Sequence, residues 1–383
     1  MTPRLALLMI ALLVGCTAGA GSQPPQPADS GGSQPAAVPS STPSAAASPA
    51  GATGSPSAAG GQGATAPARA AVRVGQIGAT IGDAPIFIAE DRGYFQEEGL
   101  DVDRTPFDSA ARMIPALAGG QLDVGGGAIS AGLFNAVGRG VSLLVVADKG
   151  SFRDGDRWNS IAVRKDLYDS GAIRDWPDLR GRSIGIPSKG TGNEIVFARG
   201  LASAGLGLDD VDLKEMGLPD IGVSLANGSL DVGLQPEPFL TRGIEQGSIA
   251  LWKGVGDVLP GAQFTVIMYA GAFAREHPDA ARRYMTAYVR GIRDYYDAFL
   301  AHRTDPDPLA RFIADFARLP NPDLVKRMYP VRFDPDGRVN ADSIASDYEY
   351  FRSTGDVTAD LDPRRLVDPQ FVDYAISRLG PYR

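Results

Sequence analysis

The hydrophobic pattern divides the chain into three parts. An apolar run, LALLMIALLV, occupies residues 5–14 directly after Arg4. Residues 17–68 are almost wholly Ala, Gly, Ser, Pro, Thr and Gln and show no apolar periodicity. From Arg69 to Arg383, short apolar runs alternate with segments whose apolar residues have helical spacing. The pattern therefore predicts an apolar leader, a polar spacer and a folded body of alternating strands and helices.

Within the folded body, one short phrase occurs twice. LAGGQLDVG at 117–125 and LANGSLDVG at 225–233 agree at seven of nine positions. Each phrase follows a helical pattern, and its Leu-Asp-Val predicts the start of a short buried strand. The agreement extends outward to two further pairs of segments, which are VRVGQIG (72–78) with RSIGIPSKG (182–190) and EEGLDV (97–102) with SAGLGLDDVDL (203–213).

This repetition predicts two similar lobes. The order strand, helix, strand, helix, strand occurs twice along the body. Strands that alternate with helices typically form parallel sheets covered on both faces. We therefore expect an α/β fold, with two parallel-sheet lobes and a ligand cleft between them. The first lobe is expected to span about 70–150 plus 265–383, and the second about 151–264.

The apolar leader has the features of an export signal. A charged start, a short apolar core and small residues precede Cys16, as in secretory signal peptides. The run is too short to cross a bilayer, which needs roughly 20 apolar residues. Leu-Val-Gly-Cys at 13–16 resembles the lipobox of bacterial lipoproteins. That resemblance implies a signal peptide at 1–15 and a lipid, such as palmitate, on Cys16. The alternative is an ordinary cleaved signal followed by a coincidental cysteine.

The spacer suits a protein tethered by such a lipid. Its only charged residue is Asp29, and it has nothing to bury. Chains of this composition stay disordered and act as flexible linkers that proline stiffens locally. We therefore expect residues 16–68 to form a lipid-anchored leash on the extracytoplasmic face of the cell membrane, with residues 69–383 as the folded, solute-binding body.

Composition excludes several classes of function. The chain has 37 Lys and Arg against 45 Asp and Glu, a formal net charge of −8, and no basic run. Nucleic-acid binders instead cluster Lys and Arg. Cys16 is the only cysteine, and the two histidines, His277 and His302, are far apart in sequence. We therefore expect no internal disulfide, no metal site built from His and Cys, no cofactor and no nucleic-acid partner.

Several longer motifs together resemble one family. They are DAPIFIAEDRGYFQEEGLDV (83–102), ALAGGQLDVGGG (116–127), DLRGRSIGIP (178–187), QPEPFLTRGIEQG (235–247) and LVDPQFVDYAISRLGPY (366–382). The chain resembles the solute-binding lipoproteins of ABC transporters for nitrate, aliphatic sulfonates, taurine and thiamine pyrimidine precursors. The resemblance implies a periplasmic-binding-protein type II fold. It also implies capture of a small-molecule solute by lobe closure and delivery to an ABC permease with its ATPase. We expect a monomer, although the sequence itself does not indicate an oligomeric state.

The second lobe contains a candidate anion-binding turn. Ligands of open parallel sheets lie beyond the carboxyl ends of the strands, where helices begin. Ser188, Thr191, Gly192 and Asn193 lie at such a place and open a predicted helix. Free N–H groups and the helix dipole favour an anionic group there, and the resembling family uses this turn for its ligand. The alternative is a helix cap without a ligand.

The first lobe offers a matching set of loop residues. Thr80, Asp83 and Ala84 precede a helix that starts near Pro85, and Ser130 starts the helix after the Gly-Gly-Gly run. All four are candidate ligand contacts, although Asp83 and Ser130 can equally be helix caps. Ser109 is a further candidate to face the cleft, although a role as helix cap alone explains its position.

Glu237 is the remaining candidate ligand contact. It stands between two prolines, which restrict the backbone on both sides. Its carboxylate suits an amino group or a ring N–H, and its alternative partner is Arg242. The aromatic candidates for stacking on a ring are Phe87, Trp158 and Phe239, each of which can instead belong to the core.

No nucleophile with an adjacent base is evident in the sequence, so we expect a binding protein without catalytic residues. Two alternatives stay open. One is a dehydratase-like enzyme on the same scaffold, with Asp83 and Glu237 as acid and base, and the other is a ligand-presenting sensor. The solute is either a nitrogen heterocycle, such as a pyrimidine or flavin, or a sulfonate- or nitrate-type anion. Glu237 favours the heterocycle.

Overall fold

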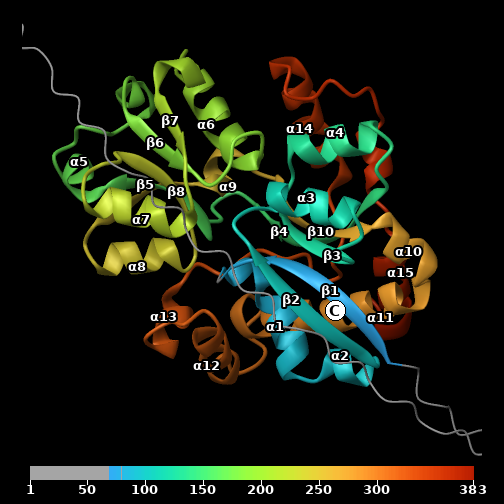
Figure 1. The fold of residues 1–383 in the computed structure, drawn as a ribbon. Helices are drawn as coiled ribbons and strands as arrows, with labels where there is room; N and C mark the ends of the chain where they lie inside the picture. The colour runs from blue at the N-terminus through green and yellow to red at the C-terminus, as the bar shows by residue number, and fades with distance from the viewer. Residues whose placement is uncertain (1–68, 79) are drawn as a thin grey trace, which may run out of the picture. The chain divides into compact units, whose positions relative to one another are not determined.

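Two five-stranded sheets form the framework of the described chain (Figure 1). The structure is a computed structural model that describes residues 69–78 and 80–383. The predicted signal peptide (1–15), the lipidated Cys16 and the leash (16–68) lie outside the described residues. All described residues belong to one unit of the chain, 63–383, and each sheet defines one lobe of it.

The first sheet has the strand order β2-β1-β3-β10-β4. Strands β1, β2 and β3 are mutually parallel, whereas β10 runs antiparallel to both of its neighbours, β3 and β4. The strand bounds are Ala70–Ile77 for β1, Leu100–Phe107 for β2, Val124–Ala128 for β3, Leu143–Ser151 for β4 and Gln263–Ala270 for β10.

The second sheet repeats this plan in the order β7-β6-β8-β5-β9. Here β6, β7 and β8 are parallel, and β5 runs antiparallel to β8 and β9. The strand bounds are Asn159–Arg164 for β5, Ser183–Ile186 for β6, Asp212–Glu215 for β7, Val232–Pro236 for β8 and Ile249–Gly254 for β9. The two sheets thus have the same topology.

Helices flank both sheets (Figure 1). In the first lobe they are α1 (Ala84–Asp91), α2 (Tyr94–Glu97), α3 (Ala110–Ala118), α4 (Ala131–Gly138), α10 (Gly271–Glu276), α11 (Pro278–Phe299) and α15 (Gln370–Leu379). In the second lobe they are α5 (Lys165–Asp169), α6 (Gly192–Ser203), α7 (Leu218–Ala226), α8 (Phe239–Glu245) and α9 (Val255–Val258). The C-terminal part adds α12 (Asp307–Phe316), α13 (Pro322–Arg327) and α14 (Ala341–Thr354). Short 3-10 helices lie at Ile81–Asp83, Trp176–Leu179, Leu208–Asp210 and Pro363–Leu366.

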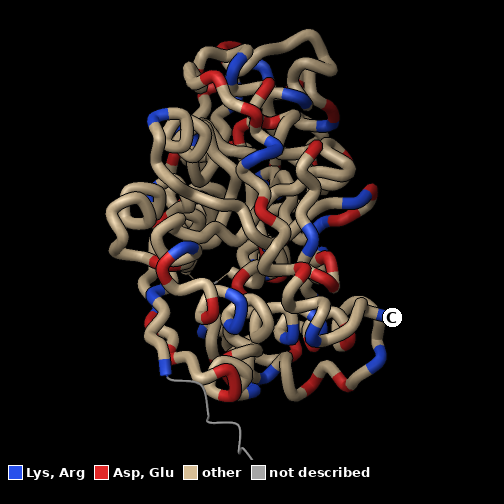
Figure 2. Tube along the Cα trace, turned by 90° about the vertical axis from the view of Figure 1, so that its right-hand side faces the viewer, with Lys and Arg blue, Asp and Glu red and all other residues tan. Residues whose placement is uncertain are grey.

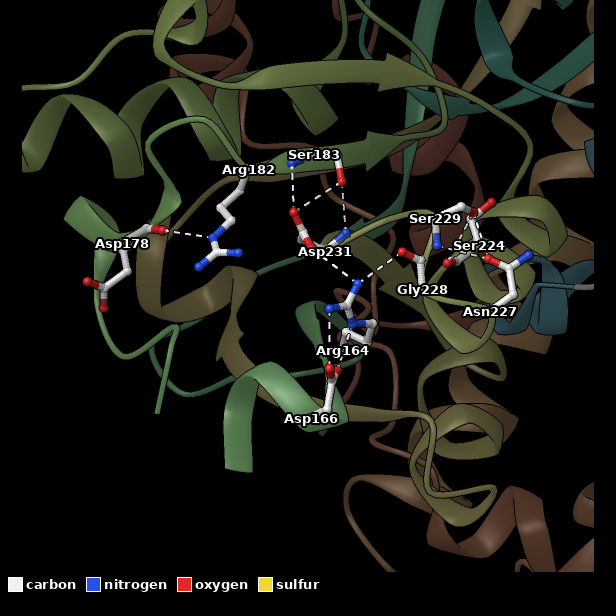
Figure 3. A network of polar contacts seen from close by, with 10 residues as sticks. All are labelled: Arg164, Asp166, Asp178, Arg182, Ser183, Ser224, Asn227, Gly228, Ser229 and Asp231. Carbon is white, nitrogen blue, oxygen red and sulfur yellow. Dashed lines mark hydrogen bonds and ion pairs between the residues drawn. The ribbon is translucent and has the colours of Figure 1, made fainter. Parts of the chain in front are cut away.

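The repeated phrase has the same structural role in both lobes. The carboxylate of Asp123 accepts a hydrogen bond from the Arg73 backbone N–H at 2.8 Å, which ties the start of β3 to β1. In the second lobe, Asp231 accepts from the Ser183 backbone N–H at 3.1 Å and so ties β8 to β6. Figure 3 shows Asp231 between Ser183 and the guanidinium of Arg164. The sequence echo therefore marks equivalent positions in two similar sheets.

These findings confirm the predicted α/β fold class and refine its sheets. The alternation of strands and helices predicts parallel pairing, which holds for three adjacent strands in each sheet. The reversed strands, β5 and β10, are those that follow the two passages of the chain between the sheets. Each enters its sheet from the other lobe, so neither belongs to a strand–helix–strand unit within one sheet.

Figure 2 shows acidic and basic residues interspersed along the trace. No helix within residues 69–78 and 80–383 is long and apolar enough to span a membrane. Over the same residues, no group of three or more His, Cys, Asp or Glu is arranged to hold a metal ion.

Candidate solute-binding cleft

A cavity, called the cleft below, lies between the two lobes. The space between its atoms is about 700 Å³ when the open solvent at its mouth is included, and the centres of water-sized molecules can occupy about 80 Å³. Its wall contains Ile77 and Ala128 from the ends of β1 and β3, and Pro187 and Pro236 from the ends of β6 and β8. The cleft therefore lies at the carboxyl ends of the parallel strands, where open α/β sheets bind ligands.

Both lobes contribute to the wall of the cleft. The first lobe contributes Ile77, Thr80, Gly82, Asp108, Ser109, Ala110, Gly127, Ala128, Lys149, Phe264 and Thr265. The second contributes Trp158, Asn159, Pro187, Ser188, Thr191, Asn193, Leu218, Pro236 and Glu237.

Five of the nine predicted contact residues line this wall, namely Thr80, Ser188, Thr191, Asn193 and Glu237. The other four, Asp83, Ala84, Ser130 and Gly192, are not part of its lining. Whether any of the nine contacts a ligand stays a prediction. The geometry does show that the loops of both lobes converge on one place, as the strand-end rule requires.

Lys149, in β4, is the main feature of the cleft that sequence reasoning missed. Its side chain is only 3% exposed, and its Nζ lies 3.1 Å from Oδ1 of the fully buried Asp83. Burial raises the pKa of Asp83, and the neighbouring Lys149 ammonium opposes that rise. Asp83 therefore serves as the counter-ion of Lys149 behind the wall, because a buried charge requires a partner.

Two glycines make room for the lysine side chain. A Cβ on Gly126 would lie 2.8 Å from Lys149 Cε, and a Cβ on Gly82 would lie 3.3 Å from Nζ. A lysine ammonium carries three N–H donors, and Asp83 is its ion-pair partner. Since Lys149 also lines the cleft, an N–H donor of this ammonium can reach a ligand there. The sequence signal for Lys149 is a charged residue next to Asp148 in a strand, LLVVADKGS, whose first five residues are apolar.

Two buried polar atoms of the wall have no internal partner. Among the residues that the structure describes, neither Asn159 Oδ1 nor Thr265 Oγ1 has a hydrogen-bond partner. Buried polar atoms are nearly always paired with protein, water or a ligand. Asn159 is 3% exposed and, with Thr265 and Lys149, forms a polar group to which both sheets contribute.

Glu237 has a structural role that the sequence did not reveal. Its Oε1 accepts hydrogen bonds from the Thr241 hydroxyl at 2.6 Å and the Tyr329 N–H at 3.1 Å. Its Oε2 accepts the Thr241 N–H at 3.1 Å. Burial raises the pKa of Glu237 to about 7 despite these hydrogen bonds. Both carboxylate oxygens are therefore engaged within the protein, at the start of α8 and by the segment after α13.

The predicted anion-binding turn forms the start of α6. Thr191 Oγ1 accepts from the Asn193 N–H at 3.3 Å and the Asn193 Nδ2 at 2.8 Å. The Thr191 hydroxyl donates to the Ser188 carbonyl oxygen at 2.8 Å. Thr191 is thus a helix cap, as the alternative interpretation held, and it lines the cleft as well. Ser130 is likewise a cap, since its Oγ accepts from the Leu133 N–H at 3.2 Å.

Aromatic rings cover one part of the wall. Trp158 stacks on Phe152 with ring centroids 4.5 Å apart, and Phe264 meets Trp158 edge-on at 6.0 Å. Trp158 and Phe264 line the cleft. Phe87 instead stacks on Phe316 at the α1–α12 contact, and Phe239 is not part of the lining. Of the three predicted stacking residues, only Trp158 lies at the cleft.

The two sheets and the cleft define a two-lobed α/β binding fold, and comparison with known proteins agrees. The family model described as NMT1/THI5 like matches residues 81–298, more than half of the chain. The chain therefore belongs to the NMT1/THI5-like family. Relatives named putative binding proteins occur in Brucella abortus (strain 2308) and Brucella suis biovar 1. Each is 24% identical over 315 residues, which cover 79% of this chain and 91% of the relative.

Solved structures show the same fold. The aliphatic sulphonate binding protein SsuA from Escherichia coli has a TM-score of 0.61 at 18% identity, covering 78% of this chain and 97% of its own. The nitrate-binding protein NrtA from Synechocystis PCC 6803 has a TM-score of 0.63 at 14% identity, with coverage of 82% and 90%. The desulfurization enzyme DSZB has a TM-score of 0.57 at 14% identity, with coverage of 80% and 99%. The predicted periplasmic-binding-protein fold and family resemblance are confirmed.

Proposed function

We propose that the protein is the extracytoplasmic solute receptor of an ABC importer, which captures a small organic solute between its lobes and delivers it to a permease. The observation that carries the proposal is the cleft, where loops of both sheets bring unpaired polar atoms beside an aromatic wall. Relatives named as binding proteins, and fold neighbours named as sulphonate- and nitrate-binding proteins, support it. The receptor acts as a monomer.

The cleft favours a solute with an anionic group. Lys149 provides a buried positive charge and Thr265 an unpaired hydroxyl that can donate to an anion, whereas the unpaired Asn159 Oδ1 is an acceptor that suits an N–H or O–H elsewhere on the solute. Trp158 and Phe264 suit an apolar body attached to that group. Glu237 was the reason for favouring a nitrogen heterocycle, and its oxygens are engaged by Thr241 and Tyr329. A sulfonate- or carboxylate-type organic anion is therefore preferred over a neutral heterocycle.

The N-terminal segment places this receptor at the membrane. A signal peptide at 1–15 directs export, and a lipid on Cys16 anchors the protein at the extracytoplasmic face. Residues 16–68 then act as a leash that keeps the body at a high effective concentration near the permease. The support for this arrangement is the residue pattern of the leader and spacer.

An enzyme on the same scaffold has weaker support. The fold alone does not decide the question, since DSZB is an enzyme. The dehydratase-like alternative needs Asp83 and Glu237 as acid and base. Asp83 pairs with Lys149 outside the lining of the cleft, and Glu237 caps α8. Neither carboxylate is thus free to act on a substrate, which favours binding without turnover.

The test is a thermal-shift screen of the exported protein carrying Cys16→Ser. The probes are alkane- and arylsulfonates, carboxylates, nitrate, pyrimidines and riboflavin. A ligand at about 100 times its dissociation constant stabilises the folded state by about 2.7 kcal/mol. We expect organic anions to stabilise the protein and to be recovered chemically unchanged.

The matched variant is the double substitution Lys149→Met with Asp83→Asn, which removes both charges of the pair and preserves their approximate volume. We expect it to lose the response to anions. Stabilisation by neutral pyrimidines alone, unaffected by the double substitution, would contradict the anion proposal. Conversion of a stabilising compound into product would contradict the receptor proposal.

A further inference from the structure

The starts of two helices, one from each lobe, pair beside the cleft, which Thr191 lines. Ser130, before α4, and Thr191, before α6, form an isolated antiparallel bridge. The Ala131 N–H donates to the Gly190 carbonyl oxygen at 2.8 Å, and the Gly192 N–H donates to the Ile129 carbonyl oxygen at 3.4 Å. Residues 129–131 and 190–192 are called the interlobe latch below.

The latch is made by backbone atoms alone. The side chains of Ser130 and Thr191 are engaged as caps of their own helices. Both residues are almost completely buried, at 2% and 1% exposure. The first N–H groups of a helix have no partner within the helix, so each helix offers a free donor to the facing loop of the other lobe. The latch can therefore form without any atom of a bound solute.

A second contact supports the latch from the C-terminal part of the chain. Glu194, in the first turn of α6, accepts the Gly190 N–H on Oε2 at 3.1 Å. Its Oε1 accepts from the hydroxyl of Tyr350 on α14 at 3.5 Å. Gly190 has a φ of +62°, a conformation that favours glycine. The loop of the latch is thus held in shape by α6 and α14 together.

We propose that the interlobe latch holds the lobes together in the solute-free protein, so that a closed conformer is populated before solute binds. This inference goes beyond the proposed transport function, because it concerns the free protein and holds whichever solute is bound. A net hydrogen bond shifts an equilibrium by roughly three- to tenfold. The two hydrogen bonds of the latch therefore keep a substantial fraction of the protein closed when the other contributions favour the open form by a similar free energy.

Electrostatics keeps the latch reversible. The N-termini of α4 and α6 meet at the latch, and both carry positive partial charge from the helix dipole. Their mutual repulsion opposes closure. If the solute is the organic anion proposed above, its negative charge in the cleft, which Ser188 and Asn193 also line, offsets part of this repulsion and strengthens the latch. The free protein then exchanges between open and closed forms, and the solute shifts the balance toward closure.

The decisive variant is Ala131→Pro. Ala131 is the first residue of α4, a position where proline fits because its N–H is not needed within the helix. Ser130 is extended (φ −143°, ψ 152°), as the residue before a proline should be. The substitution removes the donor to Gly190 and places a ring carbon against that carbonyl oxygen. The matched control is Ala341→Pro, the first residue of α14 after the non-helical Asn340.

The readout is amide hydrogen exchange in solute-free protein that carries Cys16→Ser. We expect the Gly192 amide to be protected in the parent and in Ala341→Pro. In Ala131→Pro it should exchange at least three- to tenfold faster, as expected for the loss of one hydrogen bond. A Gly192 amide that is unprotected in the parent, or equally protected in Ala131→Pro, would overturn the proposal.

A covalent test gives an independent answer. Ser130 and Thr191 are a non-hydrogen-bonded antiparallel pair, for which the Cα atoms lie about 4.5 Å apart, within the disulfide range of roughly 4.4–6.8 Å. The chain has no cysteine besides Cys16, so Ser130→Cys with Thr191→Cys in the Cys16→Ser background creates one possible bridge. We expect rapid oxidation without solute. A pair of thiols that stays reduced would contradict a populated closed form.

Discussion

Lys149 Nζ lies 3.1 Å from Asp83 Oδ1 in an ion pair that is almost completely buried at the cleft. The two residues come from different elements, since Lys149 belongs to β4 and Asp83 ends the 3-10 helix before α1. Lys149 lines the cleft, whereas Asp83 is not part of the lining and lies behind the wall. This arrangement allows a binding site to present a positive charge without leaving that charge unpaired when the site is empty.

The first prediction concerns the stability of this pair. Lys149→Met should lower the free energy of unfolding by about 3–5 kcal/mol, because it leaves the Asp83 carboxylate buried without its counter-ion. The double variant Lys149→Met with Asp83→Asn should recover most of that loss, since it removes both charges. Urea denaturation of the three proteins measures the difference. A single variant as stable as the parent would show that Asp83 does not depend on Lys149.

The second prediction concerns the glycines of the repeated phrase. A Cβ on Gly125 would lie 2.8 Å from Leu117 Cδ1, and a Cβ on Gly233 would lie 2.5 Å from Ile221 Cγ2. Overpacking of a well-packed core typically costs about 1–3 kcal/mol. Gly125→Ala and Gly233→Ala should therefore destabilise the protein by similar amounts, in different lobes, as measured by denaturant unfolding.

Gly222, inside α7, serves as the control for these substitutions. A Cβ there meets no heavy atom within 4 Å. Gly222→Ala should be neutral or stabilise the helix by up to about 1 kcal/mol. If Gly125→Ala or Gly233→Ala changed the free energy of unfolding no more than Gly222→Ala does, this result would contradict the close contact between helix and strand in that lobe.

Much of this architecture is predictable from local sequence. The echo at 117–125 and 225–233 identified the two lobes, because each copy sets the same strand start and the same helix–strand contact. Asp123 and Asp231 occupy matching positions in the phrase and accept matching backbone hydrogen bonds. The strand-end rule likewise identified the loops that line the cleft, because it depends only on the order and direction of strands.

The side-chain and backbone contacts of the candidate site instead depend on residues that are distant in sequence. Nothing local indicates that Lys149 meets Asp83, that Tyr329 occupies an oxygen of Glu237, or that the Ser130 turn pairs with the Thr191 turn. Asp83, Ser130 and Thr191 are candidate ligand contacts in the sequence because they are polar residues near helix starts. Such residues cap helices as readily as they bind ligands, and only tertiary contacts separate the two roles.

The third prediction concerns the anchor. Cys16→Ser should move the protein from the membrane fraction to the soluble extracytoplasmic fraction, because serine offers no thiol for lipid attachment. Fractionation followed by detection of the folded body measures the change. Ser30→Ala, in the spacer, is the matched control and should leave the protein on the membrane. A Cys16→Ser protein that sediments with membranes would contradict the lipid assignment.

The fourth prediction concerns the pH dependence of stability, to which three carboxyl groups with a pKa raised by burial to about 7 contribute, namely Glu237, Asp148 and Asp347. Burial raises the pKa of Glu237 from 4.5 to about 7 and that of Asp148 from 3.8 to about 7. The folded protein thus binds these protons more tightly than the unfolded chain does. The stability that each of these protonated carboxyl groups contributes is fully present below the pKa that the group has in the unfolded chain. This stability is lost as the pH rises through the folded-state pKa of about 7.

Glu237→Gln isolates one of these groups, because glutamine does not titrate. Its single oxygen can replace Oε1, which accepts from Tyr329 and the Thr241 hydroxyl, whereas the Thr241 N–H loses its acceptor by the same amount at every pH. Between pH 5 and pH 8, the free energy of unfolding of the parent should fall on the order of 2–3 kcal/mol more than that of Glu237→Gln, since one pKa unit is worth about 1.4 kcal/mol. Urea unfolding across this range gives both slopes. Glu349→Gln, on the exposed face of α14, is the matched control and should keep the parent slope. Equal slopes for the parent and Glu237→Gln would mean that Glu237 is ionised throughout, with its three hydrogen bonds outweighing the effect of burial on its pKa.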